Sequence, residues 1–307
     1  MREYKNITGV INKLDHIGIG ECYGTFGELL QGILENGHDF LVTFPINLTS
    51  KATFKSRPEE VSLTVRPKQK QKSRELALMI LEHYDLQIGG ELRIESNLPI
   101  GKGFASSSAD MVATVRSIEN CFGIQVPLSL LQKMMSQLET SDGVMYSGVV
   151  SFYNKKVELI EQFSLLPPIT IVGVDDGGEK DTLSFYKNPI IYSDDIKRRY
   201  SRMLEEMTQA LRNLDLTSIG RISLESAMLN QRSNPLKVLD NVISVFHDVN
   251  ALGVIKAHTG TYSGILLSPD DPDYDYKLQK TIKLLKDSCK NDVTVFHSLS
   301  KENATHY

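Results

Sequence analysis

A strand, a loop of small residues and a helix follow one another between residues 91 and 122, and this order constrains the fold most. Residues Glu91 to Ser96 alternate between apolar and polar side chains, which predicts a half-buried strand. A loop, Leu98 to Ser108, joins it to a helical pattern over residues 109–122. Because an alternating strand is typical of an antiparallel sheet with one exposed face, a fully buried parallel sheet is disfavoured.

The loop has the properties of a phosphate-binding segment. The first turn of the following helix exposes backbone N–H groups and a partial positive charge. Gly101 and Gly103 lack the β-carbons that would keep the backbone away from a nucleotide. Ser106, Ser107 and Ser108 supply hydroxyl oxygens suited to a phosphate-bound Mg²⁺ ion. An ordinary turn, with Ser106 as the helix N-cap, explains the same residues equally well.

Two other phosphate-binding loops do not fit this segment. The chain contains no Gly-x-x-x-x-Gly-Lys-[Ser/Thr] sequence at this position, and residues 101–106 lack the third glycine of the dinucleotide-binding fingerprint. The sequence therefore predicts neither a P-loop fold nor a Rossmann fold.

Composition excludes several other classes of protein. The 307 residues can bury roughly three-quarters of their unfolded surface, in one large or two medium domains. A formal net charge of −4 gives no reason to expect nucleic acid or an anionic membrane as a partner, and the basic run from Lys68 to Lys72 is interpreted as a solvated loop. Three scattered cysteines suggest neither disulfides nor a zinc site, and we expect a reducing, cytoplasmic compartment. We find no signal peptide or membrane-spanning apolar run.

Periodicity and turn residues predict an α+β fold in two halves. The predicted strands cover residues 17–25, 40–45, 48–55, 61–65, 91–96, 149–153, 157–160, 169–174, 254–257, 264–267 and 293–297. The predicted helices cover residues 73–84, 109–122, 128–138, 194–214, 217–230, 236–250 and 276–289. Pro167-Pro168 separates the halves, which predicts one domain over residues 1–166 and a second over residues 167–307.

The serine-rich loop resembles the Pro-x-x-x-Gly-Leu-x-Ser-Ser-Ala motif of the GHMP small-molecule kinases. The matching residues are Pro99, Gly103, Ser106 and Ser107. The residues that depart from the motif are Phe104, Ala105 and Ser108. The run from Gly101 to Asp110 looks most like the branch of L-threonine kinases of cobalamin synthesis and propanediol utilisation. The resemblance implies a GHMP kinase fold, with an N-terminal domain similar to domain 2 of ribosomal protein S5 and a C-terminal ferredoxin-like α/β sandwich.

Two further segments resemble motifs of this family. Residues 23–32 look like the first motif of the threonine-kinase branch, which implies that Glu28 and Gln31 bind the acceptor. From the residues alone, the segment is a glycine-rich β-hairpin with Gly27 and Gly32 as turn residues. Residues 256–264 resemble the third motif, a glycine loop that closes over the nucleotide phosphates. We assign no catalytic role to the histidine of this segment, His258.

Glu139 and Asp142 lie three residues apart at the end of a predicted helix. Phosphoryl transfer to an alcohol requires a metal on the triphosphate and a carboxylate near the acceptor hydroxyl. The resemblance implies that Glu139 is an Mg²⁺ ligand and Asp142 the base. A solvated helix end followed by an Asp-Gly turn is the structural alternative.

Acceptor binding is assigned to two more segments. The acidic, glycine-rich run of residues 174–182 is similar to a run in the threonine-kinase branch, which implies that Asp181 contacts the acceptor, although a surface loop fits as well. Asn230 and Arg232 lie in a segment that resembles one whose amide and guanidinium groups face the acceptor.

Together the motifs predict an enzyme that uses ATP and Mg²⁺ to phosphorylate a small alcohol. The resemblance implies L-threonine as the acceptor and O-phospho-L-threonine as the product, which supplies the aminopropanol linker of cobalamin. The predicted ATP-binding residues are Pro99, Gly101, Lys102, Gly103, Ala105, Ser106, Ser107, Ser108, Gly260 and Thr261, and the predicted metal ligands are Ser107 and Glu139. A kinase for another hydroxylated acceptor and a non-catalytic nucleotide sensor are the alternatives. The sequence does not indicate an oligomeric state.

Overall fold

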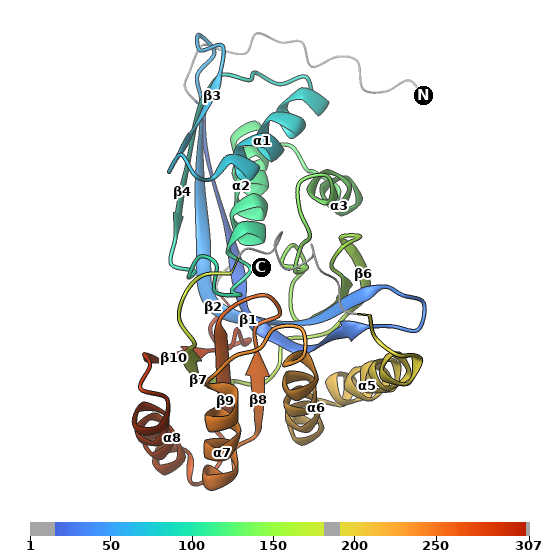
Figure 1. Cartoon of the computed structure of the whole chain (residues 1–307). Helices are drawn as coiled ribbons and strands as arrows, with labels where there is room; N and C mark the ends of the chain where they lie inside the picture. Colours follow the sequence, from blue (N-terminus) through green and yellow to red (C-terminus); the bar gives the residue numbers. More distant parts are fainter. Residues whose placement is uncertain (1–15, 181–190, 305–307) are drawn as a thin grey trace.

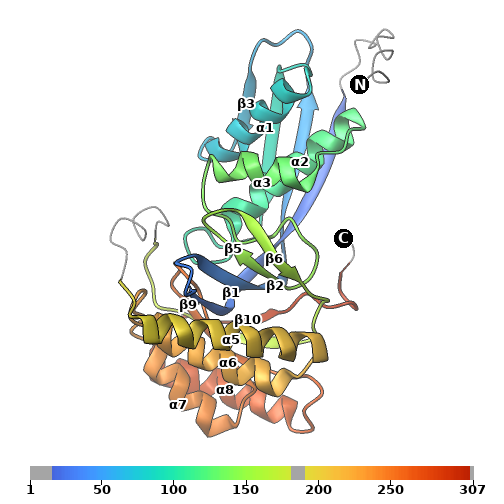
Figure 2. The same cartoon turned by 90° about the vertical axis from the view of Figure 1, so that its right-hand side faces the viewer.

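The computed structural model describes residues 16–180 and 191–304. A curled, mostly antiparallel sheet of ten strands runs through this part of the chain, with helices packed at both ends (Figures 1 and 2). The strands are β1 (Ile17–Ile33), β2 (Asp39–Ser56), β3 (Leu63–Arg66), β4 (Gly90–Ser96), β5 (Val150–Tyr153), β6 (Glu158–Gln162), β7 (Thr170–Asp175), β8 (Gly253–Lys256), β9 (Tyr262–Leu267) and β10 (Val293–His297). The helices are α1 (Gln71–His83), α2 (Ser106–Phe122), α3 (Leu128–Ser136), α5 (Asp194–Asn213), α6 (Leu216–Asn230), α7 (Leu239–Val249) and α8 (Tyr274–Cys289).

The sheet has the strand order β10-β7-β9-β8-β1-β2-β4-β3, and the β5–β6 hairpin pairs with β2. The pairing of β3 with β4 is parallel, and the other pairings are antiparallel. β1 and β8 join at one residue pair, Glu28 with Lys256. This pair links the strands of the N-terminal half to those of the C-terminal half, and it lies at the centre of the molecule beside the serine-rich loop.

The predicted α+β class is confirmed, and several boundaries differ from the predictions. The first strand, predicted over residues 17–25, continues to Ile33. The two strands expected over residues 40–55 form one continuous strand, β2. Helix α2 begins at Ser106, so the three serines lie in its first turn, and Ala105 rather than Ser106 is the N-cap residue. Ala105 has a positive φ of 55°, and it caps the helix without a side-chain hydrogen bond. The Ser106 N-cap interpretation is therefore wrong.

Helix α2 packs closely on the long strands β1 and β2 (Figure 1). A β-carbon at Gly18 would lie 2.0 Å from the carbonyl oxygen of Ser117, and one at Gly20 would lie 2.3 Å from that of Ala113. These two glycines therefore allow the helix backbone to rest on the strand. At the other end of the molecule, α5 to α8 form a layer on the outer face of the sheet (Figure 2).

Four aromatic rings lie behind the serine-rich loop and join the two halves. Phe104 of the loop contacts Phe26 of β1, Tyr262 of β9 and Phe296 of β10, with ring centroids 5.0 to 5.2 Å apart. All four side chains are buried. Burial of a side chain such as Phe contributes about 1.5–3 kcal/mol, and edge-to-face contacts add roughly 0.5–1.5 kcal/mol per pair. The loop is thus anchored to the aromatic core through the side chain of Phe104.

The glycines of the first motif are not hairpin turn residues. Gly27 lies at a register shift inside β1, with a positive φ of 53°, and a β-carbon there would lie 2.5 Å from the carbonyl oxygen of Lys256. Gly32 is also inside β1, where a β-carbon would meet the Tyr200 ring at 2.5 Å. The chain reverses at residues 35–37 instead. The predicted turn role is therefore wrong for both glycines, because each allows a close contact with a segment distant in sequence.

Three other expectations concern features away from the loop. The division into domains at residue 167 stays a prediction. The three cysteines are free. Among the described residues, no helix has both the length and the apolar character required to span a bilayer.

Candidate active site

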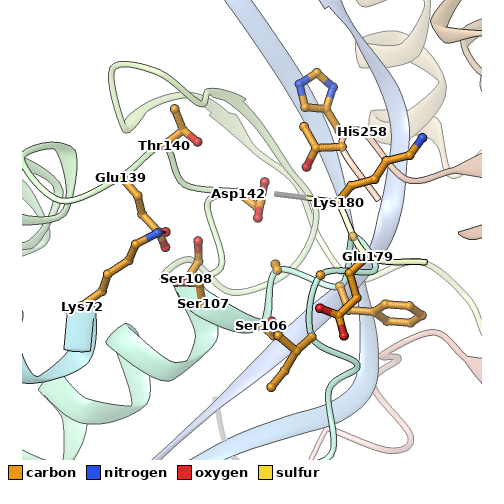
Figure 3. A pocket seen from close by; sticks show the side chains of 16 residues that line it. Lys72, Ser106, Ser107, Ser108, Glu139, Thr140, Asp142, Glu179, Lys180 and His258 are labelled. Atoms are coloured by element: carbon orange, nitrogen blue, oxygen red, sulfur yellow. Dashed lines mark hydrogen bonds and ion pairs between the residues drawn. The ribbon is translucent and has the colours of Figure 1, made fainter. Parts of the chain in front are cut away.

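A pocket of about 490 Å³ lies where the serine-rich loop meets segments from both halves of the chain (Figure 3). This volume is typical of a site for a small ligand. The lining residues are Lys72, Ile100, Gly101, Gly103, Phe104, Ala105, Ser106, Ser107, Ser108, Glu139, Thr140, Asp142, Glu179, Lys180, His258 and Thr259. In Figure 3, Glu139, Asp142 and the serines of α2 face one open space, with His258 on the opposite wall.

Neighbouring segments fix the backbone of the serine-rich loop through its carbonyl groups. The carbonyl oxygens of Lys102, Gly103 and Phe104 accept hydrogen bonds from the N–H groups of Thr261 (3.2 Å), Gly27 (3.1 Å) and Thr25 (3.2 Å). Since the N–H of a trans peptide points opposite to its carbonyl group, the N–H groups of residues 103–105 are directed away from these partners. Together with the N–H groups of the first turn of α2, they form a set of donors suited to an anion.

Positive φ angles allow the loop to take this shape. They are 68° at Gly101, 91° at Gly103 and 55° at Ala105. The glycine-containing segment of residues 256–264 packs directly against the loop, since a β-carbon at Gly260 would lie only 1.9 Å from the carbonyl oxygen of Lys102. The loop and the glycine motif of the C-terminal half are therefore in direct backbone contact.

Glu139 and Asp142 form the acidic wall of the pocket. One oxygen of Glu139 (Oε2) pairs with the ammonium group of Lys72, and its other oxygen (Oε1) is buried without a hydrogen-bond partner among the described residues. Burial raises the pKa of Asp142 to about 7, and the nearby charge of Glu139 adds to the effect. A carboxyl group with a pKa near neutrality can accept a proton from a substrate and release it again.

A third carboxyl group, Glu28, lies next to this pair. Glu28 is 3% exposed, and its Oε2 atom is buried without a hydrogen-bond partner in the part of the chain that is described. Burial raises its pKa well above the usual range, and the charge of Asp142 raises it further. An uncompensated buried carboxylate is costly, so Glu28 favours either a proton or a cationic ligand group.

The acidic wall fits a Mg²⁺ ion that also contacts phosphate. Within residues 16–180 and 191–304, no three or more His, Cys, Asp or Glu side chains are grouped so that they could hold a metal ion. Mg²⁺ in phosphoryl-transfer sites commonly uses one or two carboxylates, with phosphate oxygens and water completing the shell. The unpartnered Oε1 of Glu139 and the hydroxyl of Ser107, which line the same pocket, are oxygen ligands of this kind.

The pKa of Asp142 makes the stability of the apo protein depend on pH. Its folded-state pKa is raised from 3.8 to about 7, so the folded state binds more protons than the unfolded state between these values. The contribution of this group to stability is therefore complete below pH 4 and is lost as the pH rises to 7. Compared with Asp142→Asn, the wild type should lose at most about 4 kcal/mol of unfolding free energy over this range.

Urea unfolding of both proteins at intervals between pH 4 and pH 8 measures this difference. Asp270→Asn removes an exposed carboxylate outside the pocket wall and serves as the control. A constant difference between wild type and Asp142→Asn across the range would show that Asp142 has an ordinary pKa.

The predicted ATP-binding residues fall into two groups. Gly101, Gly103, Ala105 and the three serines line the pocket. The others lie behind or beside it: Pro99, Lys102, Gly260 and Thr261. The ammonium group of Lys102 and the hydroxyl of Thr261 both bind the carboxylate of Asp175, at 2.6 Å each. These two residues thus hold the serine-rich loop and the glycine motif together through one carboxylate.

The predicted acceptor-binding residues are more dispersed. Gln31 and Asn230 are buried in a hydrogen-bond network directly behind His258. Arg232 is exposed just after α6 and does not line the pocket. Asp181 lies outside the described residues.

Sequence reasoning missed several pocket residues, Lys72 in particular. The interpretation of residues 68–72 as a solvated loop is wrong, because α1 begins at Gln71 and two of the lysines are paired. Lys72 pairs with Glu139, and Lys70 pairs with the buried carboxylate of Asp110. The packing of α1 against α2 brings these charges together, and no local pattern indicates it. Glu179 and Lys180 also line the pocket, in a segment for which the sequence predicts only an acceptor contact at Asp181.

Comparison with known proteins identifies the class of this fold. Residues 72–152 match the family model of the GHMP kinases N terminal domain. The crystal structure of homoserine kinase from Cytophaga hutchinsonii superposes with a TM-score of 0.71 at 17% identity, covering 95% of this chain and 97% of that one. The chain therefore has the GHMP kinase fold and carries a GHMP kinase N-terminal domain, as the resemblance in its sequence implies.

Among curated proteins, the chain is similar to two L-threonine kinases. The protein from Citrobacter freundii is 23% identical over 274 residues, which cover 85% of this chain and 90% of the relative. The protein from Salmonella typhimurium is 22% identical over 263 residues, which cover 83% and 84% respectively. The similarity thus extends through both halves of the chain.

Proposed function

We propose that the protein is an ATP- and Mg²⁺-dependent kinase that phosphorylates the side-chain hydroxyl of L-threonine to O-phospho-L-threonine. One observation supports it most: the raised-pKa carboxyl group of Asp142 shares a pocket with the helix start and serine-rich loop suited to phosphate. The similarity to L-threonine kinases over most of the chain favours this acceptor. The product would then supply the aminopropanol linker of cobalamin.

Each part of the pocket has a role in this proposal. The backbone N–H groups of the serine-rich loop and of the first turn of α2 bind the triphosphate, and Gly260 and Thr261 support the loop from behind. Ser107 and Glu139 hold the metal ion, which neutralises charge on the phosphates when bound. Asp142 orients the acceptor hydroxyl and takes its proton. Most of the rate enhancement comes from positioning and charge stabilisation.

The ammonium group of an amino-acid acceptor suits the buried carboxylate of Glu28, which lacks a partner at Oε2 within the described segments. Gln31 and Asn230 lie directly behind His258, so we propose that they support the acceptor site rather than touch the acceptor. Arg232 does not line the pocket and Asp181 lies outside the described residues, so acceptor contacts by these two rest on the sequence resemblance alone. An acceptor that carries an ammonium group would thus be preferred over a neutral alcohol or an anionic alcohol such as mevalonate.

Release of ADP from Mg²⁺-ATP with a panel of acceptors tests the proposal. The panel contains L-threonine, D-threonine, L-serine, L-homoserine and mevalonate. We expect the highest kcat/KM with L-threonine. Preference for another acceptor would contradict the threonine assignment while retaining the kinase, and ATP binding without turnover on any acceptor would favour a nucleotide sensor.

Ser107→Ala tests the proposed metal ligand. Removal of this hydroxyl should raise the Mg²⁺ concentration required for half-maximal activity and weaken the use of Mg²⁺-ATP, because one oxygen ligand is lost. The matched control is Ser136→Ala, which removes an exposed serine hydroxyl at the end of α3. Titration of activity with Mg²⁺ at fixed ATP measures the effect. An unchanged Mg²⁺ dependence in Ser107→Ala would place the metal ligand elsewhere.

A further inference from the structure

Four polar side chains form a chain of hydrogen bonds that begins in the buried interior and ends at the pocket wall. They are Lys256 at the end of β8, Asn230 at the end of α6, Gln31 in β1 and His258 just after β8. Lys256, Gln31 and Asn230 are 0%, 1% and 3% exposed. A fully buried lysine is rare in proteins, and its burial here requires satisfied hydrogen bonds. The role of this polar chain is not explained by phosphate or metal binding.

Two independent contacts fix the orientation of the Gln31 amide. Its NH₂ group faces the main-chain carbonyl oxygen of Lys256 at 3.1 Å, and a carbonyl can only accept. The Lys256 ammonium group donates to Oδ1 of Asn230 at 2.7 Å, which turns the NH₂ group of Asn230 toward Oε1 of Gln31 at 3.0 Å. Both contacts require the same result: Gln31 directs its carbonyl oxygen away from β8.

This oxygen determines the proton position on His258. Oε1 of Gln31 lies 2.7 Å from Nδ1 of His258, and an amide oxygen only accepts, so Nδ1 must carry a proton. Burial lowers the pKa of His258 to about 3, and the charges of Lys155 and Lys256 lower it further. The ring is therefore neutral at physiological pH. A neutral imidazole has one N–H group, so Nε2 is an acceptor.

We propose that Gln31 is a positioning residue that fixes His258 as the neutral Nδ1–H tautomer, and that Asn230 and Lys256 fix Gln31 in turn. His258 then contributes an uncharged ring, with an acceptor at Nε2, to the wall opposite Glu139 (Figure 3). The functional consequence rests on the proposed kinase function. An imidazolium group in this pocket would lower the pKa of Asp142 and weaken it as a base.

The charged groups around His258 come from several elements. Lys256 lies at the end of β8, and Lys155 belongs to the turn between β5 and β6. Lys180, after β7, and Asp142 line the same pocket. Burial lowers the pKa of Lys256 to about 7, and the nearby charge of Lys180 lowers it further. The positive charges of Lys155 and of protonated Lys256 oppose a further positive charge at His258. Gln31 contributes a neutral acceptor, which fixes the tautomer without stabilising the charged form as a carboxylate would.

Nitrogen-15 NMR of the full chain labelled at histidine tests the tautomer directly. Comparison with His258→Asn assigns the signals of His258 among the seven histidines of the chain. We expect a protonated Nδ1 and an unprotonated Nε2, unchanged from pH 5 to pH 8. A protonated Nε2, a mixture of tautomers or a titration within this range would overturn the proposal. The measurement needs no kinase activity, so it can succeed even if the proposed function fails.

Two variants test whether Gln31 fixes the tautomer of His258. Gln31→Glu places a carboxylate against Nδ1–H, which should raise the pKa of His258 and make the ring titrate at a higher pH than in the wild type. Ser233→Ala is the matched control. It removes a 3.1 Å hydrogen bond that the NH₂ group of Asn230 donates to the Ser233 hydroxyl, and it leaves the order of donors and acceptors from Lys256 to His258 unchanged. Unchanged His258 signals in Gln31→Glu, or a changed tautomer in Ser233→Ala, would contradict the assignment.

Kinetics of Gln31→Glu separate positioning from simple structural damage. A protonated His258 should shift the pH profile of kcat, because Asp142 then ionises at lower pH, while the KM for ATP changes little. A lower kcat with an unshifted pH profile would show a structural role alone and would overturn the functional consequence.

Discussion

Replacement of Asp142 by Asn is expected to lower kcat roughly 10²- to 10⁴-fold, the usual loss when a general base is removed. The amide of Asn has nearly the same shape as the carboxyl group, but it cannot take a proton from the acceptor hydroxyl. The binding of ATP should change little, because the phosphate-binding N–H groups belong to a different segment, the serine-rich loop and the start of α2.

The test is a comparison of single-turnover rates and ATP affinity in wild type and Asp142→Asn. Asp270→Asn controls for the loss of one negative charge outside the pocket wall and should retain wild-type turnover. Turnover by Asp142→Asn within a few-fold of the wild type would exclude Asp142 as the base. Another group or water would then accept the proton, and the rate enhancement would come from the positioning of ATP and the acceptor.

Gly103→Ala is expected to have the second large effect, on nucleotide binding and stability together. Gly103 has a positive φ of 91°, and a β-carbon there would lie 2.4 Å from Cβ of Ala257 and 3.1 Å from Cα of Gly260. Left-handed strain costs roughly 1–2 kcal/mol and overpacking a further 1–3 kcal/mol. The substitution should separate the serine-rich loop from the glycine motif and raise the KM for ATP roughly tenfold or more.

Gly37→Ala distinguishes the effect of left-handed backbone strain from the effect of a steric contact made by the new β-carbon. Gly37 also has a positive φ, 81°, but no atom lies within 4 Å of the position of a β-carbon among the described residues. It should therefore lose only the strain energy, about 1–2 kcal/mol, and retain its affinity for ATP. Thermal unfolding and ATP binding of both variants provide the comparison. The prediction is contradicted if Gly103→Ala loses no more stability than Gly37→Ala and binds ATP as tightly as the wild type. The close contact between Gly103 and the glycine motif would then not be required for nucleotide binding.

Local sequence patterns were sufficient to predict much of the architecture. The alternation of residues 91–96 and the helical spacing of residues 109–122 correspond to β4 and α2, and the serine-rich loop lies between them. The predicted pair Glu139 and Asp142 lies in the same pocket as the three serines. These features depend on periodicity and on motifs that are continuous in the sequence, so they are readable without the fold.

The parts that sequence reasoning missed depend on contacts between distant segments. The role of Gly32 depends on Tyr200 of α5, and the pairing of Lys72 depends on the packing of α1 near Glu139. The sequence alone assigns no role to His258, because a single histidine after a strand is more often structural than catalytic. Its tautomer becomes readable only when Gln31, 227 residues away, is seen beside it.

The most direct test of the account is phosphorus-31 NMR of the protein incubated with Mg²⁺-ATP and L-threonine. We predict a new phosphomonoester signal with the chemical shift of added O-phospho-L-threonine, formed in an amount equal to that of ADP. We predict no such signal with Asp142→Asn in the same time. Formation of inorganic phosphate and ADP alone, or no reaction despite bound ATP, would contradict phosphoryl transfer to threonine in this pocket.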